Sequence, residues 1–486
     1  MMKPRQRSKL GLRGHTQLPQ LLNNMKTTKQ ESAVCLKLLI DEKVNRVVAA
    51  EANSDFVDIL LSFLTIPMGT IIRLTSKTDA EKAPPLKIGC MNNLYHSFEN
   101  LSPEIWNTRH CKTMVLKPRN PLSEYFTELL INVDDSGSEV LYECSRGGCK
   151  SKYENVLCNC GGMSRTCDTK DSTFASSSSE DWEPDGAFLK RERTMFIVSD
   201  NLQISPSSPA VLAQILSSLG SGEINLIKEM PVQVSKEQAV QLLARSLVSK
   251  SPLSDVFHDF LQLPNVGDLS LHSKPDKIVT SSSNGVVQKE EEETTHKLNV
   301  KVTVNKSTNS ILFAEASNEF SDFLCTFMTM PIGSMLCLLK GNSGLGCMDD
   351  LYKSMAELDL KWFHCGAIKD DLFCPKIAQH HNCKKQPLKL SEQCESGSLI
   401  NPRCSNNFLK EPSEFIISDD LEVKPLYSSS SFSILKELNV PINEIQQQQV
   451  VPISMKEALS LLKAALTSPS GALTDGLGCF LQKHKA

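Results

Sequence analysis

The stretch AEANSDFVDILLSFLTIPMGTIIRL at residues 50–74 returns without a gap as AEASNEFSDFLCTFMTMPIGSMLCL at residues 314–338. Eleven of these 25 positions are identical, and most of the others exchange one apolar residue for another. Two further matches follow in the same order: GCMNNLY returns as GCMDDLY, and FIVSD returns as FIISD. Three matches in one order indicate a tandem duplication, with copy 1 at residues 30–262 and copy 2 at residues 298–482.

Each copy opens with the pattern of a β-hairpin followed by a helix. In copy 1, apolar runs at residues 35–40 and 46–51 flank a polar turn, which is typical of a hairpin. Residues 55–65 then place large apolar side chains on one helical face and polar side chains on the other. A proline and a glycine within 67–69 are expected to end this helix, so that residues 70–74 would form another strand.

The rest of the copy adds a second helix, a Cys-rich β segment and a helical end. Residues 89–101 have the pattern of a helix, and residues 140–165 hold four cysteines after a β-prone run. Ser235 and Gln238 have the spacing of a capping box at a helix start, as does the equivalent pair in copy 2. Strands precede helices and do not alternate with them regularly, so the sequence predicts an α+β fold in two tandem copies.

The composition is that of a globular protein with more than one domain. A chain of 486 residues with 40% hydrophobic and 22% charged residues is too long for one ordinary core and too apolar for a disordered chain. Its net charge of −4 provides no broad positive field for DNA or for an acidic membrane surface. The longest apolar run, Ile59 to Met68, is about half of what a membrane span needs.

The N-terminal extension, one insertion and the joining segment are predicted to be unstructured. No secretory segment opens the chain, so we expect a cytoplasmic protein whose 17 cysteines are reduced. Residues 1–29 form a basic extension, for which nuclear import through Lys3–Lys9 and a transit peptide are the alternatives. The linker 263–297 and the serine-rich insertion 171–186 are too polar to offset their ordering entropy. We therefore expect the two copies to fold independently.

These motifs together resemble one family. The LLID stretch at 38–41, the AEA and DFVD residues at 50–58, the Pro-x-Gly at 67–69, the GCxxxLY motif and the FIxSD motif are similar to the plant domain-of-unknown-function 674 family. The resemblance covers nearly all of both copies, and members of the family typically carry the module in tandem. It implies a plant source, and it implies no activity and no catalytic residues.

Two repeated sets of residues are candidates for catalysis. Glu51 and Asp58, repeated as Glu315 and Asp322, could act as a general acid–base pair. The alternative is that Asp58 is a solvated acid that offsets the dipole in the first turn of its helix. The repeated pair His110-Cys111 could supply a Cys–His nucleophile, but neighbours on a strand point to opposite faces. No phosphate-binding loop and no nucleophile elbow is found in the sequence.

The cysteines of copy 1 are the candidate metal ligands. Cys144, Cys149, Cys158 and Cys160 lie within seventeen residues, and the glycine pairs Gly147-Gly148 and Gly161-Gly162 lie directly beside Cys149 and Cys160. Four thiolates can enclose a zinc ion tetrahedrally, and glycines allow the chain to turn tightly around it. The sequence thus predicts one structural zinc in copy 1, and the alternative is a thiol-rich loop without metal.

Copy 2 departs from this pattern because about 35 residues are missing between its HC pair and its FIISD motif. Widely spaced candidate ligands remain there, and a second metal site is a weaker alternative. They are Cys374, Cys383, Cys394, Cys404, His380 and His381.

The function that these observations favour is protein interaction. Two similar modules would present similar surfaces to unknown protein partners, as a scaffold does. One alternative is an enzyme of unrecognised type with a site between the copies or within one. A third is a zinc-dependent nucleic-acid binder, which the single basic cluster at the terminus disfavours. No membrane partner is expected.

Overall fold

The structure is a computed structural model that describes most of the two copies. It covers residues 34–78, 86–136, 140–146, 148–166, 186–191, 194–218, 224–258, 298–394, 399–403, 405–446 and 449–481. The predicted extension at 1–29, the linker at 263–297 and nearly all of the insertion at 171–186 lie outside the described residues.

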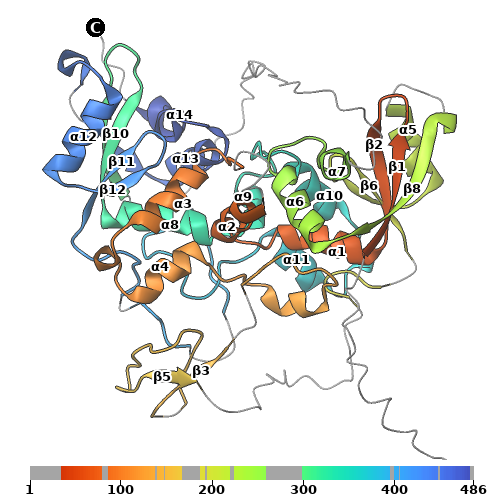
Figure 1. The fold of residues 1–486 in the computed structure, drawn as a ribbon. Helices are drawn as coiled ribbons and strands as arrows, with labels where there is room; N and C mark the ends of the chain where they lie inside the picture. Colours follow the sequence, from red (N-terminus) through yellow and green to blue (C-terminus); the bar gives the residue numbers. More distant parts are fainter. Residues whose placement is uncertain are drawn as a thin grey trace, which may run out of the picture.

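Copy 1 contains a five-stranded antiparallel sheet (Figure 1). The predicted hairpin is confirmed as β1 (Val34–Asp41) and β2 (Arg46–Ala52). Later parts of the copy add strands on both sides of it, in the order β7-β6-β2-β1-β8. These strands are β6 (Phe196–Ser199), β7 (Ile204–Pro206) and β8 (Ile227–Val234).

Copy 2 contains a second sheet of the same design. Its order β12-β11-β10-β9-β13 places the hairpin and the later strands as in copy 1, which is consistent with two similar modules. In each sheet one face packs on the core, and the other is covered by α5 (Pro209–Ser218) or α12 (Ser428–Leu438). The strands are β9 (Leu298–Val304), β10 (Ile311–Ser317), β11 (Glu414–Ser418), β12 (Val423–Pro425) and β13 (Gln449–Ile453).

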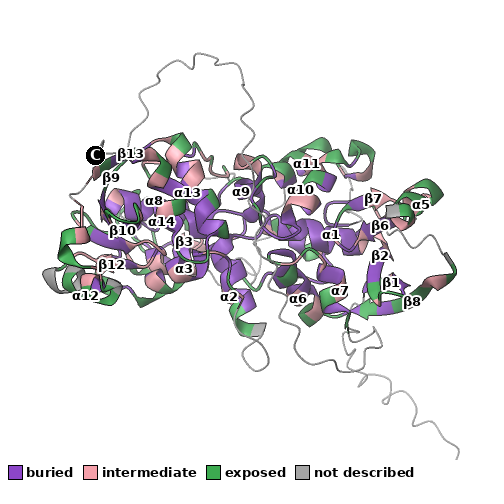
Figure 2. Ribbon diagram, turned by 90° about the horizontal axis from the view of Figure 1, so that it is seen from above, coloured by how far each residue is buried: buried purple, intermediate pink, exposed green. Residues whose placement is uncertain are grey.

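Helices fill the space between the two sheets, and the most buried of them lie in the middle of the molecule (Figure 2). The helices of copy 1 are α1 (Ser54–Phe63), α2 (Met68–Thr78), α3 (Met91–Asn100), α4 (Arg109–Leu116), α6 (Lys236–Ser246) and α7 (Pro252–Val256). Those of copy 2 are α8 (Asn318–Thr329), α9 (Ile332–Leu338), α10 (Met348–Glu357), α11 (Gly366–Phe373), α13 (Met455–Thr467) and α14 (Ala472–Leu477). Within the described part of the chain, no helix combines the length and the apolar character needed to cross a membrane.

The capping boxes are confirmed, and one predicted strand is wrong. Ser235 with Gln238 starts α6, and the equivalent pair starts α13. Residues 70–74 do not form a strand, because they continue α2. Proline is tolerated at a helix start, so Pro67 lies after the end of α1 at Phe63 and directly precedes the new helix. Residues 70–72 and 74 are buried, and a run without a polar face does not reveal its period.

The two copies meet where each Pro-x-Gly motif separates two helices. Pro67 and Pro331 form an antiparallel bridge. The N–H of Met68 donates to the carbonyl of Met330 at 3.1 Å, and the N–H of Ile332 donates to that of Ile66 at 3.1 Å. Each connection is thereby extended and paired with the other, so the chain continues into the opposite copy instead of turning back.

Beyond this crossing, the middle helices of each copy pack on the other copy. α3 contacts β12 and α4 contacts α8, so these helices of copy 1 lie on the sheet side of copy 2. In the reverse direction, α10 contacts α1 and β7 of copy 1 (Figure 2). One continuous hydrophobic core therefore contains residues of both copies.

The repeated GCxxxLY motif caps a helix of the opposite copy. The N–H of Cys90 donates to the carbonyl of Ala465 in α13 at 2.9 Å, and its thiol donates to that of Ser468 at 3.1 Å. The last carbonyls of a helix have no partner within the helix, so this contact satisfies groups that would otherwise be buried unpaired. Gly89 has a φ of +47°, and a Cβ there would lie 2.4 Å from the Ala465 oxygen.

Copy 2 makes the same contact in return. The N–H of Cys347 donates to the carbonyl of Ser246 at the end of α6 at 2.8 Å, and its thiol donates to that of Ser249 at 2.9 Å. Gly346 precedes it with a φ of +40°, and a Cβ there would lie 2.3 Å from the Ser246 oxygen. Glycine is required at both positions because each backbone approaches a carbonyl this closely.

These contacts do not match independent folding of the two copies. The boundaries at 30–262 and 298–482 remain sequence predictions, but each copy covers its core with helices from the other. The linker composition alone could not reveal this, since a polar joining segment is compatible both with separate domains and with interlocked ones.

After cleavage of the linker, the two fragments should therefore remain associated as one complex. We expect limited proteolysis between residues 263 and 297 to produce two fragments that still elute together in size-exclusion chromatography. They should separate only in denaturant, because separation exposes the shared core. The uncut chain under the same conditions is the control. Two folded fragments that elute separately in buffer would show that the copies are independent.

Candidate metal centre and the repeated carboxylates

The four candidate cysteines lie in the strands and connections of a small sheet that stands apart from the two large ones (Figure 1). This Cys-rich module, residues 140–166, contains β3 (Tyr142–Cys144), β4 (Lys150–Ser151) and β5 (Ser164–Thr166) in the order β4-β3-β5. Its β4 side docks on copy 2. The N–H of Ile400 donates to the carbonyl of Lys150 at 2.8 Å, and the hydroxyl of Tyr153 lies 3.1 Å from Nε2 of His381.

Three of the four predicted ligands come together. The Sγ atoms of Cys144, Cys158 and Cys160 all lie within 4.8 Å of one another, and those of Cys144 and Cys160 are 3.1 Å apart. Three thiols at this separation are close enough to bind one metal ion. Cys149 is not part of this trio, although its carbonyl accepts the N–H of Cys144 at 2.8 Å.

A tight turn brings these thiols together. The N–H of Cys158 donates to the carbonyl of Gly162, and the N–H of Gly161 donates to that of Cys158, both at 2.8 Å. Gly161 has a φ of +80°, and a Cβ on Gly162 would lie 2.4 Å from Sγ of Cys144. The second predicted glycine pair is thus required by the close approach of a thiol to the backbone. Gly147, from the first pair, lies outside the described residues.

The environment favours a thiolate at Cys160. Hydrogen bonds from the thiols of Cys144 and Cys158 and from the N–H of Gly162 lower the pKa of Cys160 to about 7. A metal ion binds the thiolate form of cysteine, so this turn offers a ligand that is already partly ionised near neutral pH.

The described candidate ligands of copy 2 do not assemble. Cys383 is buried, Cys394 is exposed, and Cys404 lies outside the described residues. Burial lowers the pKa of His381 to about 3, and its ring bonds to Tyr153. Among the residues described, the trio in copy 1 is the one His, Cys, Asp or Glu group with ligand atoms this close.

One cysteine pair also corrects the expectation that every thiol is reduced. Cys374 forms a disulfide with Cys337, which lies at the end of α9, and their Cα atoms are 5.6 Å apart. The two residues are 37 positions apart in the sequence, so their contact depends on the packing of α9 against α11 and no local spacing reveals it.

The repeated aspartates are buried, which is not the solvated position that we predicted. Asp58 is 2% exposed, and its two oxygens accept N–H groups from Ala187 and Leu189, both at 3.0 Å. Asp322 is 1% exposed and accepts those of Phe408 and Leu409. Each acid therefore holds a backbone segment that follows far later in the sequence. Burial raises the pKa of Asp58 to about 7 and that of Asp322 to about 8.

Their proposed partners in acid–base catalysis serve other contacts. Glu51 lies on β2 and forms an ion pair with Lys37 of β1 at 2.9 Å, whereas Asp58 contacts backbone N–H groups. The His110-Cys111 pair lies at the start of α4 and not on a strand as predicted. The Cys111 thiol is buried beside Thr108 at 3.3 Å, and the equivalent Cys365 is exposed.

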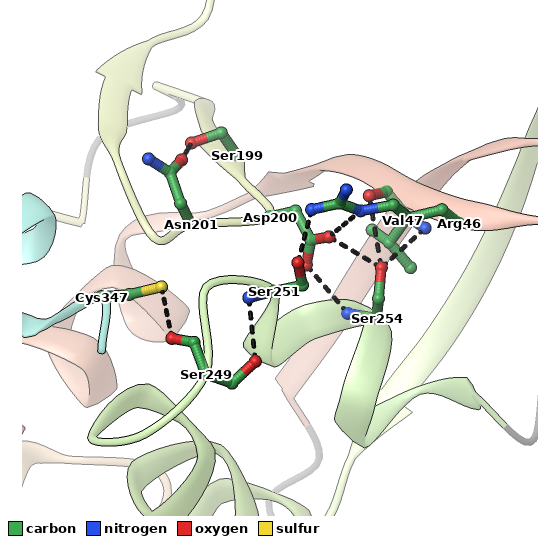
Figure 3. Close-up of polar contacts among 9 residues, drawn as sticks. All are labelled: Arg46, Val47, Ser199, Asp200, Asn201, Ser249, Ser251, Ser254 and Cys347. Carbon is green, nitrogen blue, oxygen red and sulfur yellow. Dashed lines mark hydrogen bonds and ion pairs between the residues drawn. The ribbon is translucent and has the colours of Figure 1, made fainter. Parts of the chain in front are cut away.

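A third repeated acid was missed as a candidate, although the FIxSD motif pointed to it. Asp200, the last residue of that motif, accepts the N–H of Ser254 at 2.9 Å and its hydroxyl at 2.8 Å (Figure 3). Arg46 donates to the same carboxylate at 2.8 Å. The equivalent Asp419 holds the N–H and the hydroxyl of Thr474, both at 2.7 Å. The motif thus ties a strand end to the last helices of its copy.

Comparison with known proteins identifies a family. The family model described as "Protein of unknown function (DUF674)" matches residues 30–456. No curated protein and no solved structure matches the chain.

Replacing Asp58 with Asn should cost more stability than a surface substitution. An amide has one acceptor oxygen, so one of the two buried N–H groups would lose its partner, at a cost of about 1–3 kcal/mol. Urea unfolding of the full chain measures this free energy, and Glu357→Gln on the exposed end of α10 is the control.

The stability of the wild type should also depend on pH. The pKa of Asp58 is about 7 in the folded chain, against 3.8 for an ordinary aspartate. Wild-type stability should therefore fall as pH rises between these values, and the cost of the substitution should shrink with it. A loss of unfolding free energy equal to that of the control would show that the hydrogen bonds of the Asp58 carboxylate do not stabilise the fold.

Proposed function

This chain belongs to the DUF674 family of proteins of unknown function, and we propose that it is a non-catalytic interaction protein that presents a metal-held module to a protein partner. We further propose that its two modules arose by tandem duplication. The shared motifs and the shared strand order support the duplication.

The contacts of the repeated acids favour this class over an enzyme. Asp58, Asp322, Asp200 and Asp419 each accept backbone N–H groups, and each joins segments that are distant in the sequence. A carboxylate in such a contact stabilises the fold and is shielded from a substrate. The residues that the two copies share are thus largely accounted for by their structural contacts.

The observation that carries the proposal is the exposed apolar surface of the Cys-rich module. Leu157 and Met163 pair in an antiparallel bridge, and they are 68% and 42% exposed. Partners in such a bridge have neighbouring side chains, so the two form one apolar patch. The module docks on the body through β4, which leaves this patch open to a partner.

We also propose that Cys144, Cys149, Cys158 and Cys160 hold one structural zinc ion. The close trio supports three of these ligands, and Cys149, whose carbonyl accepts the N–H of Cys144, lies in the same segment as the fourth. Four thiolates complete a tetrahedral shell and leave no position for water, so the ion would hold the turn and perform no catalysis. The module has only short strands and depends on such a crosslink.

The zinc assignment predicts a fixed metal content. The full chain, expressed with ample zinc, should contain about one zinc per molecule by elemental analysis. The double substitution Cys158→Ser with Cys160→Ser should remove it, whereas Cys35→Ser with Cys479→Ser, at two exposed cysteines elsewhere, should not. Wild-type protein without bound metal would refute the site.

The interaction surface has its own test. Proximity labelling in plant cells should identify proteins whose labelling depends on the patch. Leu157→Ser with Met163→Ser should reduce their labelling about tenfold or more, because it removes apolar anchors from a contact surface. Val44→Ser is the control, since Val44 is 62% exposed on the hairpin turn of copy 1. The proposal fails if the patch variant, folded and loaded with zinc, labels the same proteins as the wild type.

A further inference from the structure

Each copy reaches the core of the other through two helices that form one unit, which we call its arm. The arm of copy 1 is α3 with α4, and the arm of copy 2 is α10 with α11. Nζ of Lys112 in α4 donates to the carbonyl of Glu99 in α3 at 2.6 Å. In the same way, Nζ of Lys369 in α11 donates to the carbonyl of Ala356 in α10 at 2.8 Å. The two helices of each arm are therefore tied to each other.

A polar contact at the base of each arm brings its end back to the helix before its start. In copy 1 the hydroxyl of Thr70 in α2 donates to the carbonyl of Pro118, which follows α4, at 3.3 Å. In copy 2 the hydroxyl of Ser334 in α9 donates to the carbonyl of Pro375, which follows α11. A Cβ on the glycine before each hydroxyl residue would lie within 3.2 Å of the same proline. The base of the arm is thus built alike in both copies.

Copy 2 adds a disulfide at this base. Cys337 lies three positions after the hydroxyl residue, Cys374 directly precedes the proline, and their Cα atoms are 5.6 Å apart. The same two positions in copy 1 are Arg73 and Lys117, which cannot be crosslinked. Arg73 instead forms an ion pair with Asp135. Copy 1 therefore closes the base of its arm without a covalent bond.

This comparison separates the disulfide from the fold. Because the arm of copy 1 reaches its place through non-covalent contacts alone, the arm of copy 2 does not need the crosslink to do so. The crosslink is also within reach of solvent, since Cys374 is exposed and Cys337 is partly buried. An exposed disulfide is the kind that exchanges with thiols in solution.

We propose that the Cys337–Cys374 disulfide is a redox switch that a dithiol reductant opens, and that it controls how readily the arm of copy 2 leaves copy 1. A thiolate of the reductant attacks Sγ of Cys374, the S–S bond breaks, and Cys337 leaves as a thiolate that takes up a proton. The second thiolate of the reductant then attacks the mixed disulfide and releases Cys374, which is protonated in turn. Two electrons pass to the protein, and the reductant becomes a disulfide. The reverse exchange with an oxidised dithiol closes the switch, and none of these steps rests on the function proposed above.

Two equivalent thiols report the opening of the arms. Cys347 and Cys90 are both buried, and each caps a helix of the other copy. Cys347 lies inside the loop that the disulfide closes, whose ends are 37 positions apart, and Cys90 lies outside it. Without the crosslink the arm has more open conformations available to it, so it opens locally more often. The redox state should therefore change the accessibility of Cys347 and leave that of Cys90 unchanged.

Hydrogen exchange on the full chain tests the switch directly. After reduction with dithiothreitol, amides of α10 and α11 should exchange about tenfold faster, because local opening is no longer restrained. Amides of α3 and α4 should exchange as before, and oxidised dithiothreitol should restore the slow exchange. Equal exchange in the two redox states would show that the crosslink does not restrain the arm. Global unfolding on reduction would show that the disulfide is structural, and either result would overturn the proposal.

A variant without the crosslink tests the same point without a reductant, so the thiols of the Cys-rich module are left untouched. Cys337→Ser with Cys374→Ser should fold and should increase the rate of iodoacetamide labelling at Cys347 about tenfold, with no change at Cys90. Peptide mass spectrometry gives both rates in one sample.

The control removes two exposed cysteines elsewhere in the chain. Cys35→Ser with Cys479→Ser should keep both labelling rates of the wild type. Slow labelling of Cys347 in the folded crosslink variant would refute the switch. So would a wild-type chain that, in the presence of oxidised dithiothreitol, contains no crosslinked peptide of Cys337 and Cys374.

Discussion

The carbonyl groups at the ends of α6 and α13 set the arrangement of the whole molecule. The last carbonyls of any helix lack partners within it, and here those partners come from the opposite copy, through the N–H and thiol of Cys90 and Cys347. The contact is reciprocal: each copy supplies the donors for the helix end of the other, so neither copy alone satisfies its own helix carbonyls. Because the glycine before each cysteine lies against the carbonyl oxygen, the fit leaves no room for a side chain.

This constraint explains why the connection after α1 has to be extended. Only residues 64–67 separate α1 from α2, and the backbone there bonds to the equivalent connection of copy 2. The helices that follow, such as α3 in copy 1 and α10 in copy 2, therefore pack on the core of the opposite copy. The hydrogen bonds of Cys90 and Cys347 hold them there. A tandem chain favours this exchange, because the joining segment keeps the two copies at a high effective concentration. The polar linker between 263 and 297 therefore connects two interlocked halves and not two separate domains.

Local patterns in the sequence predicted the local elements, and they failed where the partner was distant. The hairpin of β1 and β2 and both capping boxes depend on neighbours in sequence, and they were predictable. The three close thiols were predictable for the same reason, since their spacing is short. The burial of Asp58 was not, because its partners near residue 188 follow some 130 positions later. A polar residue in the first turns of a helix looks solvated until the segment that covers it is known.

The two copies differ most where neither packing nor capping fixes the residue. The helix caps and the crossing use the same residue types in both copies, because a change in one copy would leave buried groups of the other unpaired, and each anchoring aspartate does the same for its own copy. The Cys-rich module lies outside that exchange and is found on one copy among the described residues. In a scaffold of two similar modules whose shared residues are committed to structural contacts, binding chemistry is expected at positions outside those contacts. A binding site is therefore best sought where the sequences of the two copies differ. The residues that the copies share form the contacts that hold the structure together.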